Sequence, residues 1–69
     1  LLWIFRDRKS DGYRQGSQLI AASKYEPAIA AFDRVIQLEP NHAEAWYLRG
    51  YACLQLGKYQ DAISSYNQA

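Results

Sequence analysis

The sequence repeats itself with a period of 34 residues. When the 69-residue chain is aligned with itself at this offset, six identical pairs fall in register: Tyr13 with Tyr47, Gly16 with Gly50, Lys24 with Lys58, Tyr25 with Tyr59, Ala28 with Ala62, and Ile29 with Ile63. A regular period of this length indicates a repeat architecture, in which a unit cannot bury its apolar face alone and stacks on its neighbour. The chain is therefore expected to fold as stacked units.

The second copy has the pattern of two helices joined by a short turn. Asn41 is expected to cap a helix, because Glu44 lies three residues later at the spacing of a capping box. This pattern predicts a helix over about 42–56. Gly57 follows, where a residue that tolerates positive φ lets the chain reverse, and Tyr59 begins the next helix. Because the connection is short, we expect the two helices to be antiparallel neighbours.

The first copy contains the matching second helix, which is predicted over Tyr25 to Leu38. Pro27 lies in its first turn, where the missing N–H costs nothing, and Pro40 follows its end. Apolar residues recur along this helix at spacings of three and four, as in an amphipathic helix: Ala28, Ile29, Phe32, Val35 and Ile36. This apolar stripe is expected to be buried.

Composition narrows the classes of partner and compartment. Apolar residues make up 49% of the chain, which is enough for a folded core and argues against disorder. A net charge of +1 provides no strong field, so no nucleic acid partner is expected. Cys53 is the single cysteine and cannot form an internal disulfide, which favours a reducing compartment. The predicted location is the cytoplasm, with the cytoplasmic face of a membrane as the alternative.

The chain begins with a short apolar run, Leu1 to Phe5, followed by charged residues from Arg6 to Lys9. A membrane-spanning helix needs roughly 20 apolar residues, so this run alone is too short to cross a membrane. One interpretation is an ordered extension or helix end that packs on the domain. The other is the last part of a membrane helix whose basic flank marks the cytoplasmic side. Membrane contact is expected only if the run continues an upstream anchor.

The second copy is similar to the tetratricopeptide repeat, a helix-turn-helix of about 34 residues whose signature includes Trp, Leu-Gly, Tyr, Ala, Phe and Pro. The residues that carry the resemblance are Trp46, Gly50, Leu56, Gly57, Tyr59, Ala62, Ile63, Tyr66 and Ala69, and the first copy adds Gly16, Tyr25, Ala28, Ile29, Phe32 and Pro40. The resemblance implies an all-α fold of antiparallel helix pairs in a right-handed α-solenoid. It divides the chain into an extension or the end of a preceding helix (1–8), a first repeat (9–42) and a second repeat without its last residues (43–69).

Four residues depart from the family pattern. Gly12 stands where a large aromatic residue is expected. Because Gly in a helix interior costs about 1 kcal/mol relative to Ala, the first helix is predicted to start late or fray. Arg49 and Cys53 replace the usual Leu and Tyr. Arg6 stands where a preceding unit would have its proline, so a third repeat is not predicted.

The sequence has no residue pattern typical of catalysis. His42 is the only histidine, so it cannot build a histidine zinc site or a relay, and it is interpreted as a solvated residue at a helix start. Cys53 occupies a packing position and is interpreted as a buried, inert thiol. The sequence contains no glycine-rich phosphate loop, paired-carboxylate arrangement or CxxC spacing. The chain is therefore not expected to be an enzyme or to hold a metal or other cofactor.

The resemblance also implies a binding surface, because the first helix of each unit lines the concave side of such arrays, where extended peptides or helices bind. The residues placed on this side are Tyr13, Arg14, Ser17, Glu44, Tyr47, Leu48, Tyr51 and Gln55. Tyrosine and arginine are frequent at binding hot spots. The alternative is that Tyr47 and Tyr51 only pack on each other or on the first unit. The subclass that grips a terminal carboxylate with Lys, Asn and Arg is disfavoured, because Tyr13, Ser17 and Leu48 stand at those places.

The last helix is expected to have an uncovered apolar face formed by Ala62, Ile63, Tyr66 and Ala69. Repeat arrays need about three units or a polar cap, so further residues, a second copy or another subunit is expected to pack there. The predicted function is a protein-interaction scaffold or adaptor that binds a protein or peptide through its concave side. The alternative is a structural or assembly subunit of a larger complex, at a membrane if the segment before Arg6 is a tether.

Overall fold

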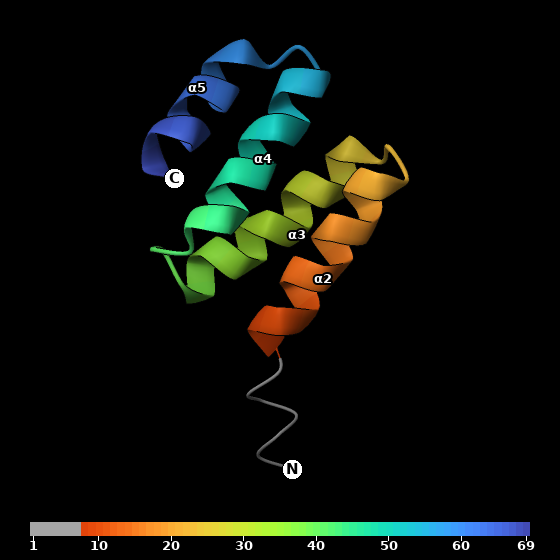
Figure 1. The fold of residues 1–69 in the computed structure, drawn as a ribbon, viewed down its shortest axis with the longest axis vertical. Coiled ribbons are helices and arrows are strands. Elements are labelled where there is room, and N and C mark those ends of the chain that lie inside the picture. The colour runs from red at the N-terminus through yellow and green to blue at the C-terminus, as the bar shows by residue number, and fades with distance from the viewer. Residues whose placement is uncertain (1–7) are drawn as a thin grey trace.

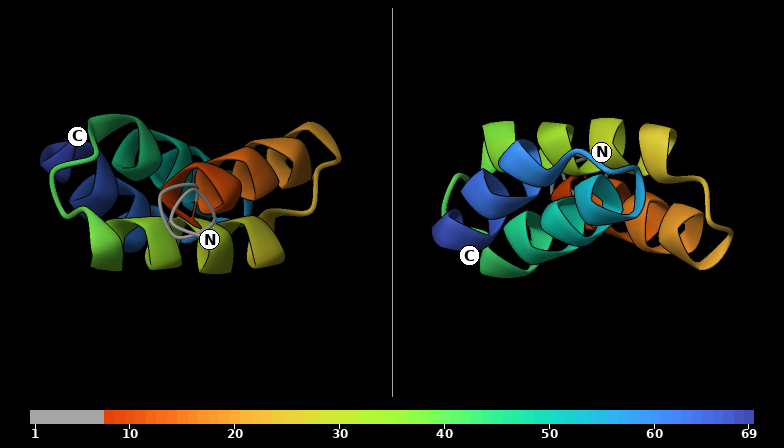
Figure 2. Two further views of the ribbon diagram at one scale, coloured as in Figure 1. Left: turned by 90° about the horizontal axis from the view of Figure 1, so that it is seen from below. Right: turned by 90° about the horizontal axis from the view of Figure 1, so that it is seen from above.

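Residues 8–69, the part of the chain that the computed structural model describes, fold into four α-helices joined by short turns (Figure 1). The helices are α2 (Arg8–Ala21), α3 (Tyr25–Leu38), α4 (Ala43–Gln55) and α5 (Tyr59–Gln68). Each helix packs against the next along the chain, and α2 and α4 lie on the same side of α3 (Figure 2). No strand occurs within residues 8–69, and the predicted all-α fold is confirmed. Residues 1–7, on which the two interpretations of the apolar run depend, lie outside the described residues.

The helix bounds follow the sequence pattern closely, with one exception. The predicted helix from Tyr25 to Leu38 is confirmed, and α4 is one residue shorter at each end than the predicted 42–56. The late start expected for the first helix is wrong, because α2 runs from Arg8 through Gly12. Packing explains the glycine: a Cβ at Gly12 would lie 2.8 Å from Cγ2 of Val35 in α3. Gly12 thus marks a close approach of two helices.

The N-cap of α4 is His42 and not Asn41, so the expected capping residue is corrected by one position. The backbone N–H of Ala45 donates to Nδ1 of His42 over 3.1 Å, which satisfies one of the amide groups left free in the first turn of a helix. The His42 ring also stacks on Tyr13 of α2, with 5.2 Å between the ring centroids. His42 stands at the helix start, as expected, but the contact with Tyr13 covers part of its ring, so the side chain is only partly solvated.

Trp46 holds the connection between α3 and α4, which is also the connection between the two units. Its indole N–H donates to the carbonyl oxygen of Pro40 over 2.7 Å. Within the same connection, the backbone N–H of His42 donates to the carbonyl oxygen of Glu39 over 3.0 Å. These two hydrogen bonds brace the turn that places α4 against α3.

The core is built around the predicted apolar stripe of α3. Ala28, Phe32 and Val35 are fully buried together with Ala45 of α4, whereas the two isoleucines of the stripe are half-buried at its edge. Burying a side chain the size of valine or phenylalanine contributes about 1.5–3 kcal/mol relative to exposure. Because Val35 and Phe32 also lie against Gly12 and Gly16 of α2, the contacts of α3 with both α2 and α4 are a main source of stability.

The 34-residue period is also visible in the packing inside each unit. The ring of Phe32 lies so close to Gly16 that a Cβ there would come within 2.6 Å of it. In the second unit the ring of Tyr66 lies against Gly50, where a Cβ would come within 3.0 Å. Small residues at these positions thus allow the two helices of a unit to approach closely.

The turns inside the two units share one backbone conformation but use different residues. Gly57 has a φ of +78°, and Ser23, its equivalent 34 positions earlier, has a φ of +61°. In both turns the N–H of the lysine that follows donates to the carbonyl group five residues before it, over 2.8 and 2.9 Å. Glycine adopts positive φ readily, whereas a residue with a Cβ is strained there by about 1 kcal/mol. The first unit therefore carries strain that the second avoids.

Ser23→Gly is expected to raise the free energy of unfolding by about 0.5–1 kcal/mol, because glycine removes the Cβ strain at positive φ. The reciprocal change, Gly57→Ser, should lower it by a similar amount. No atom lies within 4 Å of a Cβ built at Gly57, so backbone strain alone acts there. Chemical denaturation followed by circular dichroism measures both variants, and a loss of stability in Ser23→Gly would contradict the strain at Ser23.

Candidate functional site

The residues predicted to line a binding surface lie on α2 and α4 and differ in exposure. Arg14, Glu44, Tyr47 and Gln55 are exposed, and Tyr13, Ser17, Leu48 and Tyr51 are half-buried. Tyr47 is the only large apolar side chain of this set that is exposed, at 55%. The set therefore combines side chains that are free to contact a partner with side chains that belong partly to the protein interior.

Tyr47 lies beside Tyr66 of α5. The two ring centroids are 5.6 Å apart and the ring planes are tilted by 55°. Tyr66 in turn rests on Gly50, one turn after Tyr47 in α4. Burial raises the pKa of Tyr66, so its hydroxyl group stays neutral at physiological pH. Tyr47 is thus held by a neutral, partly buried ring and presents its other side to water.

Tyr51 contacts the first unit. Its ring meets that of Tyr25, the first residue of α3, in an edge-on arrangement with 6.2 Å between the centroids. Edge-on aromatic pairs contribute about 0.5–1.5 kcal/mol beyond the burial of their area. Tyr51 therefore joins the two units.

Tyr13 and Leu48 pack against the core cluster that contains Phe32. The Tyr13 ring meets the Phe32 ring edge-on, with 6.2 Å between the centroids, and it also stacks on the ring of His42. These two side chains therefore support the surface from beneath, and their substitution would change packing as well as any contact with a partner.

Charged residues on this side do not form a patch of one sign. Nη2 of Arg14 lies 3.4 Å from Oδ1 of Asp11 one turn earlier, and both side chains are exposed. Glu44 adds a negative charge in the first turn of α4. Exposed ion pairs of this kind contribute at most about 1 kcal/mol. The charged side chains assigned to this surface are therefore of both signs.

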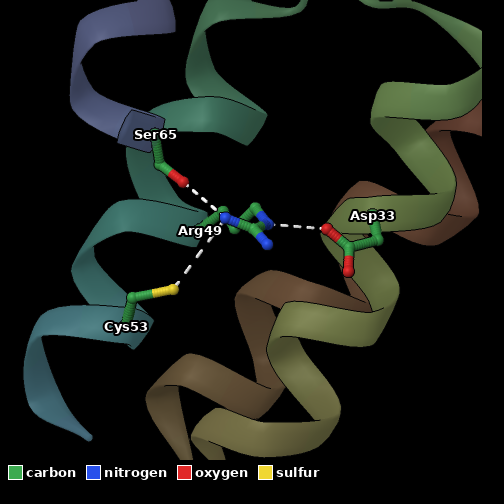
Figure 3. Close-up of polar contacts among 4 residues, drawn as sticks. All are labelled: Asp33, Arg49, Cys53 and Ser65. Atoms are coloured by element: carbon green, nitrogen blue, oxygen red, sulfur yellow. Dashed lines mark hydrogen bonds and ion pairs between the residues drawn. The ribbon is translucent and has the colours of Figure 1, made fainter. Parts of the chain in front are cut away.

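Arg49 forms a polar network that joins three helices (Figure 3). Its Nε donates to Oδ1 of Asp33 in α3 over 2.6 Å, and its Nη1 donates to Oγ of Ser65 in α5 over 2.6 Å. Nη1 also lies 4.0 Å from Sγ of Cys53, one turn later in α4. Sequence reasoning noted Arg49 only as a departure from an apolar position. An arginine at a position that packs between helices requires acceptors on the neighbouring helices. Its presence at this position was therefore the sequence signal for the network.

The surroundings of Arg49 satisfy its charge. Burial lowers the pKa of the guanidinium group, but the hydrogen bond and the charge of Asp33 outweigh burial, so the pKa is raised above its usual value. Ser65 is fully buried, and its hydroxyl group accepts a hydrogen bond from Arg49. Asp33 is about half exposed, at 49% of its side chain, so water also solvates its carboxylate. The charged and polar groups of this network are therefore paired or hydrated, and they join the two units at their boundary.

Cys53 lies under Arg49 and is 1% exposed. Burial raises the pKa of its thiol, and the nearby positive charge of Arg49 lowers it by less. A buried thiol that stays protonated is a poor nucleophile. These observations support the interpretation of Cys53 as an inert packing residue.

Two shallow hollows lie along α2. One, of about 330 Å³, is lined by Asp11, Gly12, Gln15, Arg34, Val35 and Leu38, and the other, of about 300 Å³, by Gln15, Gln18, Leu19, Ala22 and Lys24.

In the described part of the chain, no three side chains of His, Cys, Asp or Glu are grouped so that they could hold a metal ion. Within residues 8–69 no helix combines the length and the apolar character that a membrane crossing requires.

The apolar face expected on α5 differs from the observed one. Ala62 is 2% exposed, because it packs inside the second unit as Ala28 does in the first, so its assignment to the uncovered face is wrong. Ile63 is 58% exposed and Tyr59 is 63% exposed. The same two residue types stand at the equivalent positions of α3, Ile29 and Tyr25. We use the term α5 face for Tyr59, Ile63 and the solvent-facing edge of Tyr66.

Arg49→Ala is expected to lower the free energy of unfolding by about 2–3 kcal/mol, because it removes packing and leaves the buried hydroxyl of Ser65 without its donor. Arg34→Ala is the matched control. Arg34 is an exposed arginine with a 3.2 Å hydrogen bond to Gln15, and its loss should change stability by less than about 0.5 kcal/mol. Urea denaturation compares the two, and equal effects would show that the Arg49 network adds nothing.

Cys53 is expected to react with iodoacetamide more than about tenfold more slowly in the folded chain than in the guanidine-unfolded chain at the same pH, since burial and a raised pKa both suppress the thiolate. Mass spectrometry of timed samples measures both rates. Similar rates in the two states would mean that Cys53 is accessible and reactive.

The helix packing and the sequence pattern can now be compared with known families. A family model described as a tetratricopeptide repeat matches residues 13–69, a range that includes most of α2 and all of α3, α4 and α5. Tetratricopeptide repeats generally mediate protein–protein interaction, and the family is a non-catalytic interaction repeat. On this match and its helix-pair architecture, the chain belongs to the tetratricopeptide repeat family.

Proposed function

We propose that this chain is a protein-interaction module that binds a segment of a partner protein on the surface formed by α2 and α4. The family supplies the general role. The observation that carries the choice of surface is the ring of Tyr47, which is 55% exposed and held from the side by Tyr66. A supported tyrosine loses little conformational entropy when a partner contacts it and offers both an apolar face and a hydroxyl group.

The predicted surface residues take two roles in this proposal. Contact with the partner is assigned to the exposed side chains, with Tyr47 at the centre and a polar rim of Arg14, Glu44 and Gln55. Support is assigned to the half-buried ones, which hold the surface in place: Tyr13, Ser17, Leu48 and Tyr51. This division follows the usual anatomy of an interface, in which an aromatic anchor is surrounded by a polar rim.

The mixed charge of the surface bears on the partner's chemistry. Arg14 is already paired with Asp11, and Glu44 has the opposite sign to Arg14. A partner with a high net charge would therefore gain little from this surface. We infer that the partner segment is an extended peptide or an amphipathic helix with an apolar anchor and few charges, so that salt affects its binding weakly.

An assembly subunit is the second candidate function. One observation favours it: the α5 face exposes Ile63 and Tyr59, which another copy of the chain or a larger complex would cover. The membrane-tethered form of this candidate depends on Leu1 to Phe5, which lie outside the described residues. The cytoplasmic location is a proposal of the same kind and rests on the single cysteine.

Tyr47→Ala is expected to weaken binding by at least about tenfold, because it removes the anchor at the centre of the surface. Peptides selected from a display library against the chain serve as ligands, and isothermal titration calorimetry measures their affinity. Tyr59→Ala is the matched control, since Tyr59 is exposed to a similar degree, 63%, on a different helix. Its effect should stay within about twofold.

Two results would contradict the proposed surface. One is unchanged affinity of Tyr47→Ala for every selected peptide. The other is a larger loss of affinity in Tyr59→Ala than in Tyr47→Ala, which would move the binding site to the α5 face. Circular dichroism of both variants checks that the helices of the chain are retained.

A further inference from the structure

The hollow of about 330 Å³ lies between the first half of α2 and the last turns of α3, at the end of the helix pair where α2 begins (Figure 1). Val35 and Leu38 of α3 form its apolar part. Leu38 is 58% exposed, so the hollow leaves a large apolar side chain in contact with water. An apolar cavity of about 150 Å³ holds a benzene molecule, so this hollow has room for an aromatic ring.

The repeat explains why the hollow is open. The equivalent of Gly12 in the second unit is Trp46, whose half-buried ring is hydrogen-bonded to the carbonyl group of Pro40 in the connection before α4. Gly12 lines the hollow and provides no ring there. A Cβ at Gly12 would lie 2.8 Å from Cγ2 of Val35, so the close approach of α2 and α3 excludes an aromatic residue at this position. An aromatic ring in this hollow therefore has to come from another segment.

The rim of the hollow favours an uncharged occupant. Nη2 of Arg34 donates to Oε1 of Gln15 over 3.2 Å, and Oδ1 of Asp11 lies 3.4 Å from Nη2 of Arg14. The charged groups of the rim thus have partners of their own, with which a charged ligand would have to compete. An apolar ring leaves these pairs in place and gains from covering the exposed part of Leu38.

The segment Leu1 to Phe5, which lies outside the described residues, contains side chains of this kind. It precedes Arg8, the first residue of α2, and Gly12 follows one helical turn later. The helix rises by about 6 Å over these four residues, and the five residues from Trp3 to Arg8 span at most about 17 Å. Trp3 is therefore within reach of the hollow. Its covalent connection to α2 also gives it a high effective concentration there.

We propose that Leu1 to Phe5 folds back on the first unit and that Trp3 occupies the hollow, where it supplies the aromatic ring that Gly12 lacks. Trp3 suits the site better than Phe5, because its indole N–H needs an acceptor and the carboxylate of Asp11 lies at the rim. No residue that lines the hollow belongs to the predicted binding surface of α2 and α4, so this inference is independent of the proposed function.

Tryptophan fluorescence tests the proposal, because the chain has two tryptophans and Trp46→Phe leaves Trp3 as the only one. We expect Trp3 to emit at a shorter wavelength in the folded chain than in guanidine. Acrylamide should quench it at least about threefold less efficiently in the folded chain. Since Trp46 braces the connection to α4, the emission of Trp3 is also measured with Trp46 intact, as the difference between the unchanged chain and Trp3→Phe. Equal emission and quenching of Trp3 in the folded and unfolded chain would overturn the proposal.

A matched pair of substitutions places Trp3 in this hollow. Leu38 lines the hollow, Ile63 lies in α5, and both are 58% exposed. Leu38→Gln is expected to move the emission and quenching of Trp3 towards the values of the unfolded chain, whereas Ile63→Gln should leave them unchanged. Circular dichroism checks that both variants retain their helices. Equal effects of the two substitutions, or no effect of Leu38→Gln, would mean that Trp3 does not occupy the hollow.

Thermal unfolding provides a measure that does not depend on fluorescence. Trp3→Ala and Leu38→Gln are each expected to lower the unfolding temperature by at least about 3 °C. The double variant should fall within about 1 °C of the larger single effect, because both changes remove the same contact. The effects of Trp3→Ala and Ile63→Gln should add. Additive effects of Trp3→Ala and Leu38→Gln would contradict a contact between these two side chains.

Two further measurements test the other places that this segment could occupy. Dilution over a hundredfold range should leave the emission of Trp3 unchanged, and a shift to longer wavelength would show that a second copy of the chain supplies the ring. Vesicles of phosphatidylcholine and phosphatidylglycerol should also leave it unchanged. If Trp3 emits in buffer as it does in the unfolded chain and shifts only when vesicles are added, the segment inserts into a membrane and the proposal is overturned.

Discussion

The contact of an aromatic ring with a glycine sets the geometry on which the rest of this molecule depends. Phe32 lies against Gly16, where no room is left for a Cβ, and Tyr66 lies against Gly50, where a Cβ would fit only if the ring shifted slightly. Each contact brings the two helices of a unit together. Because Phe32 is also part of the cluster that includes Ala45, the same ring positions α4 against α3 and hence the second unit against the first.

The central position of α4 follows from this packing and explains why one helix combines so many roles. It contacts both α3 and α5, and its Arg49 reaches an acceptor on each of them. The opposite side of the same helix presents Tyr47 beside Tyr66. A partner that contacts Tyr47 would therefore bind to a helix already anchored by apolar packing and by a polar joint, so little order would have to be created on binding.

The two units are similar in backbone but differ where their surroundings differ. Gly12 and Val35 in the first unit stand where the second has Trp46 and Ala69, so a large and a small residue have exchanged places across the helix pair. Ser23 adopts the left-handed conformation that Gly57 provides without strain. The hollow between α2 and α3 belongs to the same asymmetry, because Gly12 contributes no ring to it.

The sequence by itself determined the period, the helix pairs, the buried stripe of α3 and the glycine turn, because these depend on the spacing of residues along one helix or within one turn. Only the tertiary structure decided that His42 caps α4 against Tyr13 and that Arg49 joins Asp33 to Ser65. Each of these depends on which side chains of other helices come within a few ångströms, and periodicity along a single helix carries no information about the identity of those neighbours.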